Sequence, residues 1–366
     1  MKIKKAYKYR LKPNRQQQDA LAIQFGHARF AYNDGLGRKK EYYKANGKGL
    51  SFYDLKKEIT QLKRESETEW LKQADSQVLQ SKVKDLDIAY KNFFEGRAKY
   101  PRFKSKRSRQ SIRYPQRFKV EGNKIYLPKV GWVKAIIHRP IEGDMKNCTV
   151  SKTKSGQYYV SIQCEVEIDE PVYEGEHIGV DLGLRDFLTI NTGEKIDNPR
   201  HLRQTEKKLA KAQRQLSRKV KGSANWEKQR ITVARLHERV ANQRRDFHHK
   251  LSYRLVTENR IITLESLNVK GMVRNRKLAK SIADAGWSQF VSMIEYKAAW
   301  YGCHSEKINR FFPSSKTCSE CGAINHDLTI SDSKWVCTEC GVVHDRDINA
   351  AINIQAQSTV GAAETP

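Results

Sequence analysis

The sequence predicts an α+β protein made of more than one domain. Its 366 residues leave room for two or three domains, each with a hydrophobic core. Segments that alternate apolar and polar residues, as strands do, are interspersed with segments of helical periodicity. Two C-x-x-C pairs near the C-terminal end predict a further small unit organised by a metal ion.

The N-terminal part predicts one strand followed by a small helical bundle. Residues 3–11 alternate apolar and basic side chains up to Pro13, which stops the strand. Apolar residues then recur at helical spacing over three stretches, residues 16–45, 53–64 and 76–95.

Short alternating runs after residue 120 predict an antiparallel sheet or barrel. These runs are KIYLP, WVKAIIH, CTVSKT and YYVSIQCEVEI. The strand at residues 3–11 would complete that sheet, so the helical bundle is interpreted as an insertion into a β-domain. We expect a domain boundary near residues 171–176.

The second half predicts a mixture of strands and helices. HIGVDLGLRDFLTINTGE gives a strand, a tight turn and a second strand. Residues 200–255 are helical and basic, and Gly222 and Ser223 divide them into the two arms of a helical hairpin. Then follow a strand in RIITLESL, a helix over 286–302, a strand in SEKINRFF and, after the cysteine-rich insert, a final helix in DINAAINIQAQ.

The charge predicts a polyanionic partner. Lys and Arg number 69 against 41 Asp and Glu, which gives a net charge of +28, far more than solubility requires. The N-terminus has no apolar signal region, and no stretch has the roughly 18 apolar residues needed to cross a bilayer. We therefore expect no membrane partner and a cytoplasmic location in a reducing compartment.

Four of the seven cysteines predict a structural zinc site. Their spacing is C-x2-C-x15-C-x2-C, and a glycine follows each pair. Four thiolates complete a tetrahedral Zn²⁺ site and leave no position open for catalysis, whereas a redox C-x-x-C would need only one pair. The ligands are Cys318, Cys321, Cys337 and Cys340. The other cysteines, Cys148, Cys164 and Cys303, lie in apolar segments and are interpreted as buried small hydrophobes.

Three carboxylates at the ends of predicted elements are the candidate catalytic residues. Asp181 ends the strand run HIGV, Glu265 ends RIITL, and Asp347 begins the last helix. A carboxylate among apolar strand residues is costly unless it is paired or binds a metal. Each has a local alternative as a turn residue, a surface charge or a helix cap, and Asp345 competes with Asp347 but suits the cap better.

Together these three positions are the parts of an RNase H-like nuclease site. Clustered carboxylates can hold two Mg²⁺ ions about 4 Å apart, one activating water and one stabilising the leaving oxygen of a phosphodiester. Asp186, on the hairpin after Asp181, is interpreted as a turn residue or a support for the metal ligands.

A basic segment over residues 97–119 predicts nucleic-acid contacts. It contains no acidic residue, and aromatic residues that could stack on bases interrupt it. The alternative, a merely solvated charged face, is stronger for residues 200–255. The candidate contacts are Arg97, Lys99, Arg102, Lys104, Lys106, Arg107, Arg109 and Arg113.

Several motifs, in order along nearly the whole chain, resemble TnpB (OrfB), the transposon-encoded RNA-guided DNA endonucleases related to compact type V CRISPR effectors. They are YRLKP, YPRFKSKR, GVDLGLRDFLTI, LESLNVKGM, FFPSSKTCSECG and HDRDINAAINI. The resemblance places the family's three RuvC acids on Asp181, Glu265 and Asp347.

The resemblance also implies a domain plan. A β-barrel wedge domain would cover 1–12 and 97–172, and a helical recognition domain 13–96. A RuvC-like nuclease domain would cover 173–310 and 344–366, interrupted by a zinc ribbon over 311–343 that helps to load the target strand.

The implied activity is Mg²⁺-dependent cleavage of double-stranded DNA next to a short motif. A guide RNA from the transposon end would pair with the target, and the wedge and recognition domains would read the motif. Tyr53 and the stretch around Lys82 are weak candidates for that reading. In a prokaryotic cell the protein would be at the nucleoid when bound to its target.

Three other functions are compatible with parts of the sequence. A nuclease-silent RNA-guided regulator would be expected to lack one of the three acids, and all three are present. A transposase, or an accessory protein of one, would join DNA ends. A zinc-ribbon RNA-binding module would leave the three carboxylates without a role.

Overall fold

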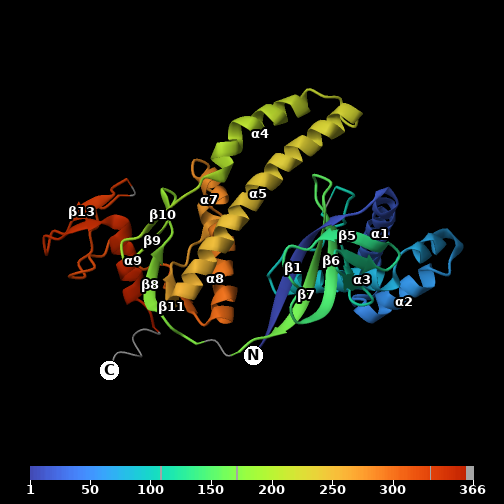
Figure 1. The fold of residues 1–366 in the computed structure, drawn as a ribbon, viewed down its shortest axis with the longest axis horizontal. Coiled ribbons are helices and arrows are strands. Elements are labelled where there is room, and N and C mark those ends of the chain that lie inside the picture. The colour runs from blue at the N-terminus through green and yellow to red at the C-terminus, as the bar shows by residue number, and fades with distance from the viewer. Residues whose placement is uncertain (108, 170–171, 330, 360–366) are drawn as a thin grey trace. The chain divides into compact units, whose positions relative to one another are not determined.

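The computed structural model describes residues 1–107, 109–169, 172–329 and 331–359 (Figure 1). The chain forms two compact units, Met1–Ile168 and Asp169–Pro366. The sequence placed a boundary near residues 171–176, of which position 171 lies outside the described residues. Each unit is described by itself below.

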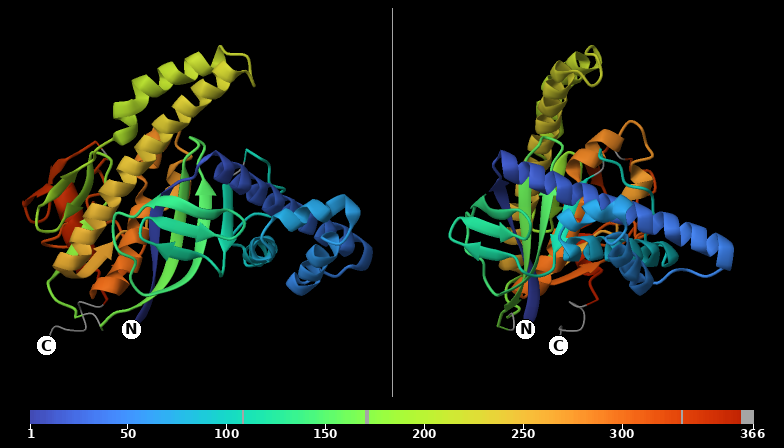
Figure 2. Two further views of the ribbon diagram at one scale, coloured as in Figure 1. Left: turned by 45° about the vertical axis from the view of Figure 1, so that its right-hand side comes forward. Right: turned by 90° about the vertical axis from the view of Figure 1, so that its right-hand side faces the viewer.

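The described part of the first unit contains a seven-stranded antiparallel sheet with the order β2-β6-β7-β1-β5-β4-β3. Figure 2 shows that this sheet is curled. The described pairings leave β2 and β3 at its two edges, which agrees with the antiparallel sheet among the two predicted alternatives, a sheet or a barrel. Its strands are β1 (Lys2–Lys12), β2 (Gln110–Tyr114), β3 (Lys119–Glu121), β4 (Lys124–Leu127), β5 (Gly131–Ile136), β6 (Asp144–Lys152) and β7 (Tyr158–Glu167).

Strand β1 lies inside this sheet, as the sequence predicted. It pairs with β7 along its length, for example Tyr7 with Ile162, and with β5 near its end, where Leu11 faces Ala135. The apolar residues of its alternating pattern are buried. Because β2 begins only at residue 110, the helices between β1 and β2 are an insertion into the β-fold.

The inserted helices begin at side chains that cap them. Asn14 and Ser51 each form a capping box with the third residue of their helix, and Asp75 accepts two backbone N–H groups. Their apolar faces share one core, which includes Leu36, Leu55 and Leu79. The helices are α1 (Arg15–Asn46), α2 (Phe52–Leu62) and α3 (Ser76–Phe94), with an unpredicted 3₁₀ helix, η1 (Ser66–Gln73), before α3.

The described part of the second unit contains a five-stranded mixed sheet with the order β10-β9-β8-β11-β12. Strand β11 is parallel to its neighbours β8 and β12. Strand β9 pairs antiparallel with both β8 and β10, so the predicted hairpin after residue 176 is present. The strands are β8 (Glu176–Asp181), β9 (Asp186–Ile190), β10 (Lys195–Asp197), β11 (Asn259–Leu264) and β12 (His304–Lys307).

Helices cover both faces of this sheet, with α9 on one side and α5 and α8 on the other (Figure 1). The core between the sheet and α5 and α8 contains Val180, Leu255 and Phe290. The helices are α4 (His201–Ser217), α5 (Ala224–Glu258), α6 (Val269–Met272), α7 (Ala279–Ala285), α8 (Trp287–Tyr301) and α9 (Arg346–Ala356). Helices α4 and α5 form the predicted hairpin, and Ser223 caps α5.

The cysteine-rich insert between β12 and α9 has little regular structure. Strands β13 (Lys334–Val336) and β14 (Val343–Asp345) pair antiparallel, and Trp335 lies opposite His344. Its small core combines Leu328 and Trp335 with two of the cysteines. No helix in the described residues is both long enough and apolar enough to cross a membrane.

Helix α9 approaches β8 very closely at Gly179. A Cβ atom on this glycine would lie 2.1 Å from the carbonyl oxygen of Ala351 and 2.5 Å from the backbone nitrogen of Gln355. On the helix, the small residues Ala350 and Ala351 are buried. The glycine in β8 and the alanines in α9 therefore set the depth at which the helix lies on the sheet.

We expect Gly179→Ala to destabilise the second unit by about 1–3 kcal/mol, because the new methyl group overlaps backbone that cannot rotate away. Gly37→Ala is the matched control, since a Cβ there meets nothing within 4 Å and alanine favours the helix. Calorimetric unfolding of both variants measures the effect. Equal midpoints for Gly179→Ala and the unmodified chain would contradict the close approach.

Candidate nuclease site and cysteine cluster

The three predicted acids lie at the ends of elements that the fold brings together. Asp181 is the last residue of β8, and Glu265 directly follows β11. These strands are parallel neighbours in which Val180 pairs with Leu264, so both acids leave the same edge of the sheet. Asp347 is the second residue of α9, which packs on β8.

One pocket of about 270 Å³ contains all three acids in its wall. Gly183 allows the turn after Asp181, since a Cβ there would lie 2.7 Å from the carbonyl oxygen of Asp186. Asp186 also lines the pocket, in keeping with a supporting role. The basic side chains of the wall are Arg185, Lys316 and Arg346.

The charges in this pocket repel one another. Burial raises the pKa of Asp181 well above its ordinary value, and the negative charges of Glu265 and Asp347 raise it further. Burial also raises the pKa of Glu265, although a hydrogen bond from the hydroxyl of Ser314, at 2.7 Å, partly opposes this. The pocket therefore favours any species that brings positive charge to the carboxylates.

Arg346 neutralises part of this charge. Its Nε and Nη2 atoms lie 3.0 and 2.8 Å from Oδ1 of Asp347, and it lowers the pKa of Asp181 through its positive charge. Sequence reasoning did not single it out, because a single arginine in a chain this basic carries no distinguishing pattern.

Asp345 is the helix cap that the sequence suggested. Its carboxylate accepts the backbone N–H groups of Asp347 and Ile348, at 3.1 and 3.2 Å. It also forms an ion pair with Lys195 of β10, at 2.7 Å. Asp345 therefore fixes the start of α9, and Asp347 is the acid that lines the pocket.

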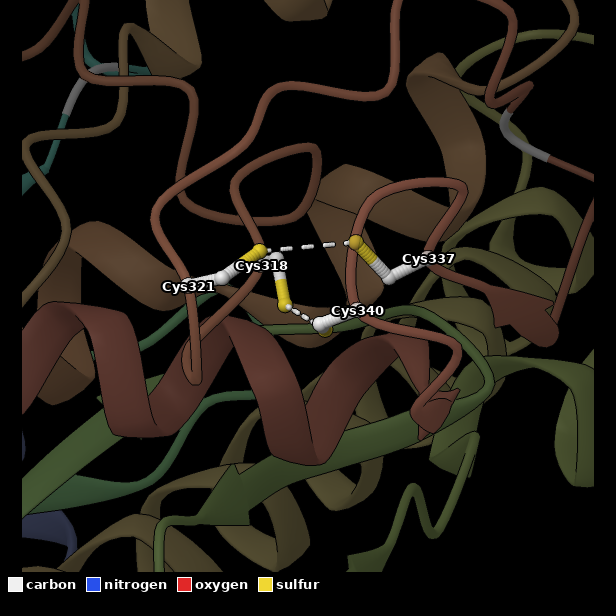
Figure 3. Close-up of side chains that lie close together, drawn as sticks. All are labelled: Cys318, Cys321, Cys337 and Cys340. Carbon is white, nitrogen blue, oxygen red and sulfur yellow. Dashed lines mark hydrogen bonds between the residues drawn. The ribbon is translucent and has the colours of Figure 1, made fainter.

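The four predicted zinc ligands form a tight cluster. Their sulfur atoms all lie within 4.8 Å of one another, and the side chains point toward a common centre (Figure 3). Within the described residues, these four cysteines are the one set of three or more His, Cys, Asp or Glu side chains whose ligand atoms are close enough to bind a common metal ion. The three pocket carboxylates do not form such a group here, and Asp347 is instead turned to Arg346.

Two turns of similar geometry shape the cluster. The N–H of Gly322 bonds to the carbonyl of Cys318, and that of Gly341 bonds to the carbonyl of Cys337. Both glycines have left-handed φ angles, 79° and 74°, which explains the glycine after each pair. A backbone N–H from Cys340 lowers the pKa of Cys337, whereas the pKa values of Cys321 and Cys340 are raised in the same cluster.

His344 adds a contact to this cluster that sequence reasoning missed. Its Nε2 atom lies 3.0 Å from Sγ of Cys318, and its ring packs against Trp335 in a tilted arrangement, with 4.7 Å between the ring centroids. A thiolate at Cys318 would accept an N–H from this nitrogen. The remaining cysteines, Cys148, Cys164 and Cys303, are buried in the cores as predicted.

The candidate nucleic-acid residues are mostly exposed. Lys104 is the exception among the eight, because it is half-buried with its Nζ 3.7 Å from the ring centre of Tyr32. Burial lowers the pKa of Lys104 to about 8. Of the interleaved aromatics, Phe103 is 56% exposed, whereas Tyr114 is fully buried and cannot stack on a base.

Helix α3 and the turns at its two ends supply counter-ions that the basic segment itself lacks. Arg97 pairs with Glu95, Arg113 lies 3.6 Å from Asp85, and Arg117 lies 2.7 Å from Asp75. The segment is therefore less positive than its sequence implies. Asp85 and Asp75 lie far from Arg113 and Arg117 in the sequence, so the local pattern gave no sign of these two pairs, whereas Glu95 is only two residues before Arg97.

The two weak candidates for reading a DNA motif differ in exposure. Tyr53 is 71% exposed at the start of α2. Lys82 is buried on α3, and its Nζ bonds to Asp85 at 2.9 Å. Tyr53 is thus accessible to a partner, and Lys82 is engaged within the unit.

Comparison with known proteins gives matches over most of the chain. A family profile described as "Probable transposase" matches residues 161–276, a "Cas12f1-like, TNB domain" profile matches 287–354, and a "Helix-turn-helix domain" profile matches 1–48. In this structure residues 1–48, which the helix-turn-helix profile matches, form β1 and the single long helix α1.

Two relatives cover almost the entire sequence. A "Putative RNA-guided DNA endonuclease" of Streptomyces pristinaespiralis is 40% identical over 99% of this chain and 91% of its own length. The "Putative RNA-guided DNA endonuclease InsQ" of Escherichia coli is 36% identical over 97% of this chain and 92% of its own length.

A solved structure has a similar fold. It is the Cas12f1 chain of a "Cas12f1-sgRNA-target DNA complex", with a TM-score of 0.60 and 15% identity over 97% of this chain and 99% of that chain. The fold of this chain is thus similar to that of the Cas12f1 chain. The chain belongs to the TnpB (OrfB) family, as its motifs indicated.

We expect Asp345→Ala to lower the free energy of unfolding by about 1 kcal/mol, because α9 loses its cap. Asp345→Asn keeps an oxygen that can accept the two N–H groups and loses only the ion pair with Lys195, so its effect should be smaller. Urea unfolding of both variants tests this. A larger loss for Asp345→Asn than for Asp345→Ala would contradict the capping role.

Proposed function

We propose that this protein is a transposon-encoded, RNA-guided DNA endonuclease that cuts both strands of its target with a single RuvC-like site. The pocket that gathers Asp181, Glu265 and Asp347 carries this proposal. The names of the two relatives support an RNA-guided nuclease, and the similarity to Cas12f1 supports the fold.

The donor set of the pocket fits Mg²⁺, which prefers carboxylate oxygens. Asp181, Glu265 and Asp347 would hold two ions, and the mutual repulsion that raises the pKa of Asp181 would be relieved by them. When bound, such ions supply an activated water and stabilise the leaving oxygen of a phosphodiester. The acids act as ligands and do not attack the DNA themselves.

The basic residues of the pocket suit a DNA strand as substrate. Arg185, Lys316 and Arg346 line the same wall as the acids and offer positive charge to phosphate oxygens. Because Arg346 bonds to Asp347 in this structure, that carboxylate would have to release at least part of this contact to bind a metal ion.

The cysteine cluster fits Zn²⁺. Four thiols within 4.8 Å of one another match the ligand number and type of a closed tetrahedral site. The insert has a very small apolar core, so the metal would supply most of its stability. We assign this zinc a structural role.

For the domain plan, we propose a wedge domain over 1–12 and 97–172 and a recognition domain over 13–96. A RuvC-like domain would cover 173–310 and 344–366, with the zinc ribbon over 311–343. The insertion of α1–α3 between β1 and β2 supports the first division, and the position of the cysteine insert between β12 and α9 supports the second.

The guide RNA from the transposon end and the target DNA would contact the exposed cations of the basic segment, residues 97–119. The strongest candidates are the exposed cations that form no ion pair with an acidic residue in the described part of the chain: Lys99, Arg102, Lys106, Arg107 and Arg109. Contacts to phosphates would weaken as salt rises. The protein would act in the prokaryotic cytoplasm, at the nucleoid when on its target.

Asp181→Ala should abolish cleavage of a matched plasmid by the purified ribonucleoprotein in Mg²⁺, while guide and target binding persist. The loss should exceed the ~10- to 100-fold typical of residues that only support metal ligands. Asp246→Ala, at an exposed position on α5, is the matched control and should cut normally. Cleavage by Asp181→Ala at the unmodified rate would refute the site.

The purified protein should contain about one zinc ion per chain, as expected for one tetrahedral four-thiolate site. Cys321→Ser should lower the zinc content and the unfolding temperature, because one ligand is replaced by a weaker one. Cys148→Ala, whose thiol is buried in the other unit, should keep its zinc. Metal analysis measures the content, and equal zinc in both variants would contradict the assignment.

A further inference from the structure

The three pocket acids are joined to one another in two different ways. Asp181 ends β8 and Glu265 directly follows β11, and these two strands are paired in one sheet, so backbone hydrogen bonds hold the two acids near each other. Glu265 and Asp347 lie on elements that are not paired strands. A loop of the cysteine insert, residues 314–319, connects these two elements through side-chain hydrogen bonds.

Ser314 contacts both sides of this connection. Its hydroxyl donates to Oε1 of Glu265 at 2.7 Å, and its backbone carbonyl accepts Nδ2 of Asn353 from α9 at 2.8 Å. Ser314 and Asn353 are 5% and 7% exposed, so these bonds are shielded from water. Shielded bonds to a carboxylate are strong and directional.

A second asparagine, one turn earlier on α9, fastens the rest of the loop. The carbonyl of Thr317 accepts Nδ2 from both Asn349 and Asn353, at 2.7 and 2.6 Å. Oδ1 of Asn349 accepts the backbone N–H of Ser319 at 2.9 Å. Both residues held in this way are neighbours of Cys318.

Hydrogen bonds of the loop 314–319 therefore connect the cysteine cluster to the pocket. Asn349 and Asn353 lie on the face of α9 that meets the loop, and Asp347 lies at the start of the same helix. Asn353 of α9 bonds to the backbone of Ser314, and the hydroxyl of Ser314 bonds to Glu265. The cysteine cluster fixes the loop at Cys318, between the two residues that Asn349 binds.

We propose that Ser314 is a positioning residue for the nuclease reaction, and that Asn353 and the first cysteine turn hold it between Glu265 and α9. In this role the cysteine insert does more than keep itself folded, because it sets the position of Glu265 relative to Asp347. The inference rests on the proposed function, since it concerns the acids of that site.

Ser314→Ala tests the proposal with little risk to folding, because it removes one oxygen atom. We expect the cleavage rate constant at saturating guide and target to fall by about 10- to 100-fold, the usual range for residues that orient metal ligands. The Mg²⁺ concentration for half-maximal rate should rise, while target affinity and zinc content stay unchanged. Ser314→Thr keeps the hydroxyl and should recover part of the rate.

Ser331→Ala is the control, since Ser331 is an exposed serine of the same insert whose hydroxyl bonds locally to Thr329. It should match the unmodified protein in rate and Mg²⁺ requirement. An unchanged rate and Mg²⁺ requirement for Ser314→Ala would overturn the proposal. A loss that appears only in target affinity would also overturn it, because the role would then be in binding.

A double-mutant comparison tests the link through α9. Asn353→Leu has similar volume and lacks the amide that holds Ser314 and Thr317. If both residues act through one contact, the rate of Ser314→Ala combined with Asn353→Leu should fall little below that of Asn353→Leu alone. Losses that multiply would show independent effects and would refute the link.

The outcome is distinguishable from failure of the proposed function. If Asp181→Ala is inactive and Ser314→Ala is normal, only the positioning role is wrong. If Asp181→Ala still cuts, the nuclease site itself is misassigned, whatever Ser314 does. Guide binding and zinc content in every variant separate both results from misfolding.

Discussion

The close approach of α9 to β8 is the constraint on which the second unit depends. Only glycine at position 179 leaves room for the backbone of the helix, which lies 2.1 Å from where a Cβ would be. At this depth, the first turn of α9 places Asp347 beside the edge where Asp181 and Glu265 leave the sheet. A helix held farther away would leave two acids on the strands and the third out of reach.

Gathering these carboxylates has an electrostatic cost that the surrounding residues partly offset. Burial and mutual repulsion raise the pKa of Asp181, Arg346 pairs with Asp347, and Ser314 donates to Glu265. Arg346 is the immediate neighbour of Asp347 in α9, whereas Ser314 belongs to the cysteine insert and lies 49 residues from Glu265. The carboxylates of the pocket thus repel one another, which favours the binding of a cation. The hydrogen bonds from Ser314 and Arg346 hold Glu265 and Asp347 in place despite this repulsion.

The cysteine insert is connected to this pocket more extensively than its small size suggests. His344 contacts Cys318 and lies three residues before Asp347, and two asparagines of α9 bind the backbone on both sides of Cys318. The insert has only a small apolar core, and its hydrogen bonds attach it to Glu265 and to α9, which carries Asp347.

The sequence by itself determined the order of most strands and helices, the four clustered cysteines and the three acids, because periodicity, spacing and position at an element's end are local properties. Tertiary structure alone decided that Asp85 and Asp75 would neutralise Arg113 and Arg117. It also decided that Ser314 would donate to Glu265. Such contacts join residues far apart in the chain, and their geometry is fixed only when packing has brought the elements together.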